Sequence, residues 1–120
     1  MFFDEGNCEL YDAVRPVNWK DPEQGEEPYD ILVIGGGAGG LVTAAQSKGL
    51  GARVCLIERQ FLGGDCLNNG CVPSKAFLKC CSVAYNAKNA ADYGVVIKGP
   101  IEIDFAAVME RMRKIRADIS

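Results

Sequence analysis

The sequence contains no histidine, no long apolar run and no basic stretch at its N-terminus. Without histidine the chain cannot form the mixed cysteine and histidine ligand set of a zinc finger. No apolar stretch approaches the roughly 20 residues that span a bilayer. Asp4 and Glu5 directly follow Phe3, so the N-terminus lacks both the basic and the apolar region of a signal peptide. We therefore expect a cytoplasmic protein with no membrane partner.

The composition is that of one modest globular domain. The chain has 120 residues, of which 48% are hydrophobic and 24% charged. The net charge of −3 provides no general attraction to nucleic acid or to an anionic membrane. In a reducing compartment, the six cysteines are expected to be free, catalytic or metal-binding rather than structural disulfides.

Residues 1–28 are predicted to form an acidic extension outside the domain. Pro16, Pro22 and Pro28 interrupt this segment, and no helical or strand periodicity runs through it. Its acidic residues include Asp21, Glu23, Glu26 and Glu27. We expect most of the segment to lie on the surface, although Val17 and Trp19 could pack against the domain.

A strand–turn–helix–strand pattern begins at residue 29. Residues 29–34 are apolar and rich in β-branched side chains, which is typical of a buried parallel strand. Six small residues at 35–40 follow, and then a helix is expected that runs to Lys48 and stops at Gly49 and Gly51. Residues 53–58 form the second predicted strand. The sequence therefore predicts an α/β fold of Rossmann type with a parallel sheet.

The second half of the chain is predicted to be mainly helical. A loop at 59–65 precedes a helix at about 73–91, a short strand at 93–97 and a final helix capped by Asp104. The final helix has one apolar stripe, and its basic residues are interpreted as a solvated face rather than a nucleic-acid site. These basic residues are Arg111, Arg113, Lys114 and Arg116.

The glycines of the turn match the dinucleotide-binding pattern G-x-G-x-x-G. Gly35 allows the sharp turn out of the strand, Gly37 allows close approach of a pyrophosphate, and Gly40 allows the helix to pack near the sheet. Glu58 stands 18 residues after Gly40, where a carboxylate can accept the hydroxyls of an adenosine ribose. A flexible glycine loop is the structural alternative, and the turn alone does not separate FAD from NAD.

Cys66 and Cys71 are the candidate reactive cysteines. In a regular helix, residues five apart have Cα atoms about 8–9 Å apart, which is too far for a disulfide. Asn68, Asn69 and Gly70 are suited to an irregular turn between them. Two alternatives remain open, namely a pair of buried free thiols and a zinc site with Cys80 and Cys81, although the chain has no C-x-x-C knuckle. A helix N-terminus nearby is expected to lower a thiol pKa.

The region from Tyr29 to Ser120 resembles the pyridine nucleotide-disulfide oxidoreductases of class I. The resemblance rests on the glycine turn, on Glu58, and on the C-x4-C segment followed by Val-Pro-Ser-Lys. It implies an N-terminal, partial FAD-binding domain, with NAD(P)H as the electron donor of the complete enzyme. Within the family, Gly-Gly-Asp-Cys-Leu-Asn and the final helix are most similar to mercuric-reductase-like and dihydrolipoamide-dehydrogenase-like proteins.

The resemblance also implies roles for individual residues. Cys66 is the interchange thiol that reacts with substrate, and Cys71 faces the flavin. The implied FAD-binding residues are Gly35, Gly36, Gly37, Ala38, Gly39, Gly40, Glu58, Arg59, Gly64, Asp65, Cys66 and Lys75. Electrons are expected to pass from NAD(P)H through FAD to a Cys66–Cys71 disulfide, and then to a sulfur substrate or to Hg(II).

In this family the nicotinamide and dimerisation domains follow the FAD-binding part, and the complete enzymes are homodimers. The dimerisation domain usually supplies a catalytic histidine, and this chain contains no histidine. We therefore expect a fragment that does not turn over NAD(P)H alone. The alternative is a non-catalytic dinucleotide-binding module, in which Cys66 and Cys71 never form a redox couple.

Overall fold

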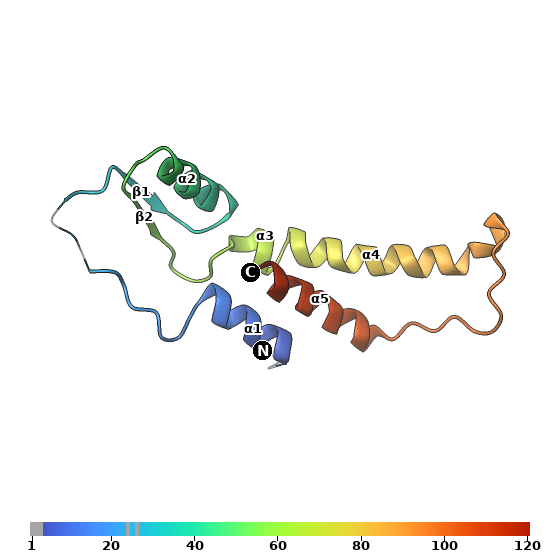
Figure 1. Cartoon of the computed structure of the whole chain (residues 1–120). Helices are drawn as coiled ribbons and strands as arrows, with labels where there is room; N and C mark the ends of the chain where they lie inside the picture. Colours follow the sequence, from blue (N-terminus) through green and yellow to red (C-terminus); the bar gives the residue numbers. More distant parts are fainter. Residues whose placement is uncertain (1–3, 24, 26) are drawn as a thin grey trace.

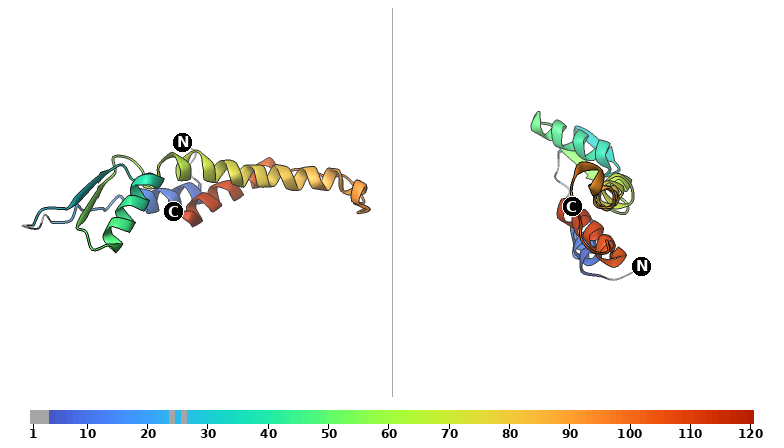
Figure 2. Two further views of the ribbon diagram at one scale, coloured as in Figure 1. Left: turned by 90° about the horizontal axis from the view of Figure 1, so that it is seen from above. Right: turned by 90° about the vertical axis from the view of Figure 1, so that its right-hand side faces the viewer.

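The computed structural model describes residues 4–23, 25 and 27–120. Met1–Phe3, Gln24 and Glu26 lie outside the described residues, so part of the predicted acidic extension does too. The molecule is elongated, with extents of 70 × 31 × 16 Å (Figures 1 and 2). Its radius of gyration of 20.3 Å exceeds the value of about 14 Å expected for a compact domain of this length. Most apolar side chains are therefore only partly covered.

The predicted βαβ unit is present at one end of the molecule (Figure 1). Strand β1 (Ile31–Ile34) pairs in parallel with β2 (Val54–Ile57), and α2 (Ala38–Gly49) connects them. Gly51 ends the connection with a φ of +96°, as its predicted role as a helix stop requires. The α/β prediction is confirmed for this unit.

The sheet is less buried than its apolar sequence predicted. Val33 is buried, but its neighbours Leu32 and Ile34 are 57% and 82% exposed. Successive residues of a strand point to opposite faces, and α2 contacts this two-stranded sheet from one side. Continuous apolar strands are typical of sheets that are covered on both faces, so the open face accounts for the difference.

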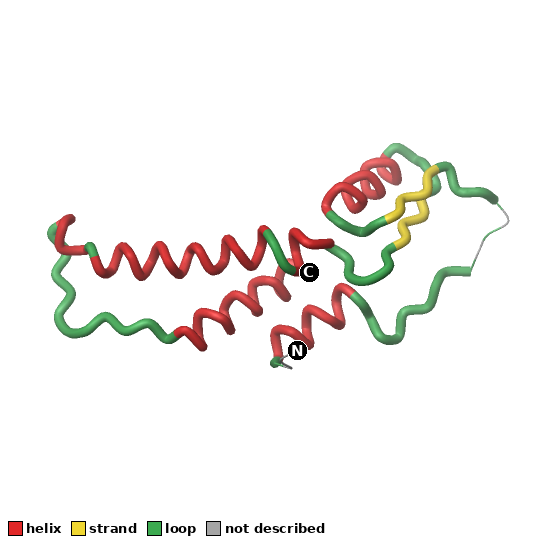
Figure 3. Tube along the Cα trace, turned by 180° about the vertical axis from the view of Figure 1, so that it is seen from behind, coloured by secondary structure: helices red, strands yellow, loops and turns green. Residues whose placement is uncertain are grey.

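Three helices and a 3₁₀ turn follow the sheet (Figure 3). Helix α3 (Gly64–Asn68) is short and was not predicted, whereas α4 (Cys71–Lys88) begins two residues before the predicted start. Helix α5 (Phe105–Ile119) begins as predicted, because the Asp104 side chain accepts a hydrogen bond from the Ala107 N–H at 3.0 Å. Helices α4 and α5 run antiparallel and pack against each other.

The predicted strand at 93–97 is wrong. A 3₁₀ turn, η1 (Ala90–Tyr93), occupies its beginning, and Gly94 ends the turn in the left-handed region with a φ of +74°. The described residues contain one two-stranded sheet, formed by β1 and β2, and these strands lie at the other end of the molecule. An isolated strand leaves its backbone groups without partners, so the segment continues as an irregular loop.

The expectation of an irregular N-terminal extension is also wrong for its first part. Helix α1 (Glu5–Val14) is capped by Asp4 and packs along α5, so the two ends of the described chain lie side by side (Figure 1). Leu10 and Val14 are 4% and 5% exposed, and they are among the few buried residues. Val17 and Trp19, by contrast, are 90% and 68% exposed and do not pack into the domain.

The packing of α1 also corrects the interpretation of the basic residues on α5. The Nε atom of Arg113 lies 2.5 Å from Oδ2 of Asp4. Arg116 is half-buried and forms hydrogen bonds to α1 and α3. The basic face is therefore divided: Arg111 and Lys114 are exposed, whereas Arg113 and Arg116 form the polar part of a helix–helix interface.

Candidate functional site

The glycine turn leaves the first turn of α2 available to a ligand. Gly35 has a φ of +105°, and its N–H donates to the carbonyl of Ile57 at 2.8 Å, which joins the turn to β2. Gly37 is the N-cap of α2, and no side chain of the described residues caps this helix. The first N–H groups of a helix have no intrahelical partner and attract anions. Ala38 and Gly39 lie exposed in this first turn.

Gly40 is required for contact between the helix and the strand. A Cβ atom at this position would lie 1.8 Å from the carbonyl oxygen of Gly35 and 3.3 Å from Cγ1 of Val33. These distances allow no side chain. The predicted packing role of the third glycine is confirmed.

Glu58 lies against the same turn, directly after β2. Its Oε1 accepts the N–H of Gln60 and its Oε2 accepts the N–H of Gly36, both at 2.6 Å. These donors, led by Gln60, lower the pKa of the Glu58 carboxyl below its usual value of 4.5. The carboxylate is therefore ionised at neutral pH, and each of its oxygens retains a lone pair for a further donor. The neighbouring Arg59 is exposed.

A second pair of glycines connects the turn to the cysteine segment. The N–H of Gly63 donates to the carbonyl of Gly36 at 2.8 Å. A Cβ atom on Gly64 would lie 2.8 Å from the Cα of Gly37, and both Gly63 and Gly64 have positive φ. The two glycine segments are thus in direct backbone contact. The structure thereby places the start of α3 beside the start of α2.

The chain between the two cysteines bends as predicted. Helix α3 ends at Asn68, and the N–H groups of Asn69 and Gly70 both donate to the carbonyl of Asp65, at 2.9 and 2.6 Å. Helix α4 then begins at Cys71. Asn69 and Gly70 therefore form the break that a continuous helix would not provide. The side chain of Asp65 is exposed in the first turn of α3.

Cys66 and Cys71 are both free thiols. Interaction with the Cys71 side chain, followed by desolvation, raises the pKa of Cys66 above its usual value of 9.0. The backbone N–H of Cys71 and the charge of Lys75 act in the opposite direction but are weaker. The expected lowering of the pKa by the helix N-terminus therefore operates at Cys66, but it does not dominate.

The described residues contain no group of three or more histidine, cysteine, aspartate and glutamate side chains that could hold a metal ion. Cys80 is half-buried and Cys81 is exposed, further along α4. These two cysteines therefore do not complete a zinc site with Cys66 and Cys71. Within the part of the chain that the structure describes, no helix is long and apolar enough to cross a membrane.

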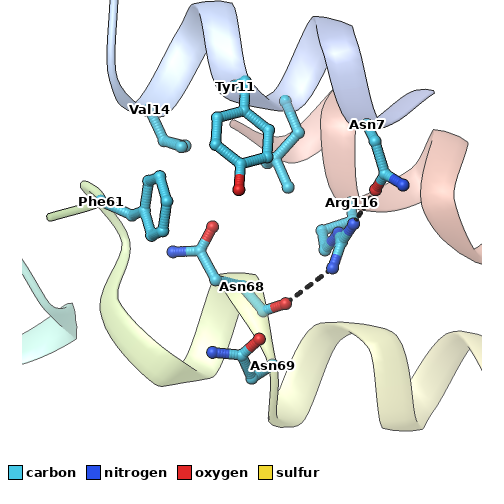
Figure 4. A pocket seen from close by; sticks show the side chains of 8 residues that line it. Asn7, Tyr11, Val14, Phe61, Asn68, Asn69 and Arg116 are labelled. Atoms are coloured by element: carbon cyan, nitrogen blue, oxygen red, sulfur yellow. Dashed lines mark hydrogen bonds between the residues drawn. The ribbon is translucent and has the colours of Figure 1, made fainter. Parts of the chain in front are cut away.

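Two residues that support the cysteine segment were not identified from the sequence (Figure 4). Asn68, the last residue of α3, is buried, and Arg116 of α5 donates a hydrogen bond to its carbonyl oxygen. Together with α1 and Phe61 they line a cavity of about 80 Å³. The sequence did contain a signal for the packing of α1 in this region: Leu10, Tyr11 and Val14 are spaced so that they give α1 an apolar face.

The geometry can be compared with that of known proteins. The family model described as pyridine nucleotide-disulphide oxidoreductase matches residues 29–119. A dihydrolipoyl dehydrogenase from Rhizobium etli is 39% identical over 94 residues, which are 78% of this chain and 20% of that protein. One from Acholeplasma laidlawii is 41% identical over 83 residues, which are 69% of this chain and 25% of that protein. A mitochondrial one from Pisum sativum is 42% identical over 92 residues, which are 75% of this chain and 18% of that protein.

The chain thus spans about a fifth to a quarter of the length of these curated relatives. The matched residues include the whole βαβ unit, the cysteine segment and α4. All three relatives carry the name dihydrolipoyl dehydrogenase. They give no support to the narrower resemblance to mercuric reductases.

Proposed function

The chain belongs to the pyridine nucleotide-disulphide oxidoreductase family, and from this premise we propose that residues 29–120 carry the FAD site and the redox-active cysteines of a flavoprotein disulfide oxidoreductase. The fold is the Rossmann-like FAD/NAD(P)-binding fold, and FAD and NAD(P)H are the cofactors of the family. The observation that supports the proposal best is the backbone contact between the two glycine segments. This contact joins the glycine turn to the segment that carries Cys66 and Cys71, which supports a single site for the nucleotide and the thiols.

The residues of the turn fit a dinucleotide. Gly40 has room for no side chain, the first turn of α2 is uncapped, and Glu58 is ionised. We propose that the N–H groups at the start of α2 bind the pyrophosphate and that Glu58 accepts hydrogen bonds from the ribose. Arg59, Gly64, Asp65, Cys66 and Lys75 complete the proposed FAD-binding set, together with Gly35, Gly36, Gly37, Ala38, Gly39 and Gly40.

FAD, when bound, accepts a hydride from NAD(P)H and supplies two electrons to the cysteine pair. The chain's own contribution is thiol chemistry. Cys66 attacks one sulfur of a substrate disulfide and releases the first thiol product; Cys71 then attacks Cys66, which releases the second and closes the Cys66–Cys71 disulfide. Lys75 lies one helical turn after Cys71, and its positive charge favours the thiolate form of Cys66.

The names of the relatives favour a small dithiol or disulfide substrate of the dihydrolipoyl type. With such a dithiol the same steps run in reverse, and the cysteine disulfide is the oxidant. We further propose that the complete protein acts as a homodimer. The test compares NAD⁺-dependent oxidation of dihydrolipoamide with NADPH-dependent reduction of Hg(II), using the protein as its gene encodes it.

The dihydrolipoamide reaction is expected to be the faster of the two, and Cys66→Ser should abolish it. A faster reaction with Hg(II) would contradict the proposed substrate class. A protein that binds no FAD in a fluorescence titration would contradict the function itself. The alternative of a binding module without redox chemistry predicts FAD binding, but no additional thiols after mild reduction of the oxidised protein.

A further inference from the structure

Asn68 lies between the two cysteines and is the one buried polar residue among those that the structure describes, with 7% of its surface exposed. Its Nδ2 donates to the carbonyl oxygens of Leu62 at 3.1 Å and of Gly64 at 2.8 Å. The side chain therefore ties the last residue of α3 to the loop in front of that helix. An unpaired buried amide is costly, so these two bonds favour a single arrangement of α3.

Arg116 holds the backbone of the same residue from the opposite side (Figure 4). Its Nη1 donates to the carbonyl oxygen of Asn68 at 2.8 Å. This carbonyl lies at the C-terminal end of α3, where helices have no internal donor to offer. The Nη2 of Arg116 donates to Oδ1 of Asn7 in α1. One guanidinium thus connects α1, α5 and the end of α3.

The carbonyl that Arg116 binds lies at the start of the break that brings the thiols together. Helix α3 ends at Asn68 and α4 begins at Cys71. A continuous helix would hold the two cysteines too far apart for a disulfide. Where α3 ends therefore determines how Cys66 faces Cys71. A contact that fixes this end acts directly on the geometry of the pair.

We propose that Arg116 is a positioning residue for the cysteine pair: its bond to the Asn68 carbonyl, supported by Asn7, aligns Cys66 and Cys71 for disulfide closure. The proposal rests on the proposed function, because it requires that the two thiols form a disulfide. In exchange with oxidised glutathione, the two thiols lose two protons and two electrons, one S–S bond forms between them, and two molecules of reduced glutathione are released. Loss of alignment makes the closed disulfide easier to reduce.

The test measures the equilibrium constant of this exchange in glutathione buffers, on the protein as its gene encodes it. Trypsin cleaves after Arg59 and Lys75, so Cys66 and Cys71 fall in one peptide that contains no other cysteine. Alkylation followed by mass spectrometry of this peptide gives the oxidised fraction. For Arg116→Met we expect the constant to fall about tenfold, or about 30 mV for two electrons.

Two further variants of α5 make the result specific. Arg116→Lys keeps the charge but loses the planar group that reaches two acceptors at once, so its constant should lie between those of the wild type and Arg116→Met. Arg111→Met removes the same charge from an exposed position of the same helix and should leave the constant unchanged. Equal constants for Arg116→Met and Arg111→Met would overturn the proposal.

If Arg116→Met loses the native far-UV circular dichroism spectrum, the Asn7→Ala variant provides the test instead. It keeps Arg116 but removes the side-chain oxygen that accepts the hydrogen bond from Arg116 Nη2. A fall of about threefold then supports the proposal, and an unchanged constant overturns it. A wild-type peptide that forms no Cys66–Cys71 disulfide at any glutathione ratio would contradict the proposed function, and the positioning role would fall with it.

Discussion

Gly40 lies directly against Gly35, at the crossing of α2 and β1. Because a Cβ atom on Gly40 would stand 1.8 Å from the Gly35 carbonyl oxygen, no rotamer change relieves the clash. We expect Gly40→Ala to lower the free energy of unfolding by about 3 kcal/mol and to abolish FAD binding. Urea unfolding and a flavin titration measure the two effects.

Gly49→Ala is the matched control for this substitution. It lies in the last turn of the same helix, and a Cβ atom there would meet nothing within 4 Å. Replacing a helical glycine by alanine at an unstrained position stabilises a protein by about 0.5 kcal/mol. Equal losses of stability in Gly40→Ala and Gly49→Ala would show that the close approach of helix and strand does not hold in solution.

The Glu58 carboxylate makes the stability of the glycine turn dependent on pH. Its pKa in the folded protein is below the value of 4.5 in the unfolded chain, because N–H donors favour the ionised form. The stabilisation is therefore complete above about pH 4.5 and is lost as the pH falls through the lower, folded-state pKa. Glu58→Gln should reduce this loss in unfolding experiments across the acidic range. Glu23→Gln, at an exposed position, should leave the pH profile as it is in the wild type.

The neighbouring Cys71 thiol predicts how fast Cys66 is alkylated. The Cys71 side chain is the largest cause of the raised pKa of Cys66, so the reactive Cys66 thiolate is scarce while Cys71 is present. Cys71→Ala should lower the pKa of Cys66 and speed its reaction with iodoacetamide at neutral pH. The rate is followed by mass spectrometry of the peptide that contains Cys66. Cys81→Ala, further along α4 and exposed, should not change it; a slower reaction in Cys71→Ala would contradict the prediction.

Helix α1 is expected to be part of the folded core. Leu10 is 4% exposed and packs in the interface with α5, so Leu10→Ala should cost about 3 kcal/mol of unfolding free energy. Val17 follows the helix and is 90% exposed, so Val17→Ala should change stability by less than about 0.5 kcal/mol. Denaturant unfolding of both variants measures the difference. A loss near zero for Leu10→Ala would mean that α1 does not dock.

Features with a short-range cause were predicted well from the sequence. The turn at Gly35, the stop at Gly51 and the Asp104 cap each depend on a backbone conformation or on a hydrogen bond within three residues. The break at Asn69 and Gly70 was also predicted, because these residues favour irregular turns. Local rules of this kind apply whatever the rest of the chain does.

Features that depend on distant partners were not predicted. Asn68 was assigned to a turn, and its burial depends on Arg116, which stands 48 positions later. The segment 93–97 has the composition of a strand but no neighbouring strand to pair with among the described residues. Helix α1 was not predicted, because the segment around it is acidic and contains prolines, although the apolar residues of α1 have helical spacing. In each case the missing information was the identity of the packing partner.

Helices α1 and α5 pack together although 90 residues separate Val14 from Phe105. During synthesis from the N-terminus, α1 therefore leaves the ribosome long before its partner exists. At about 5–20 residues per second, the delay is about 5–18 s. Throughout this interval Leu10 and Val14 lack the surface of α5, and a chaperone can bind them. Docking of α1 on α5 can thus occur only after residues 105–119 have been made, and the contacts of α5 with α1 and α3 become complete only then.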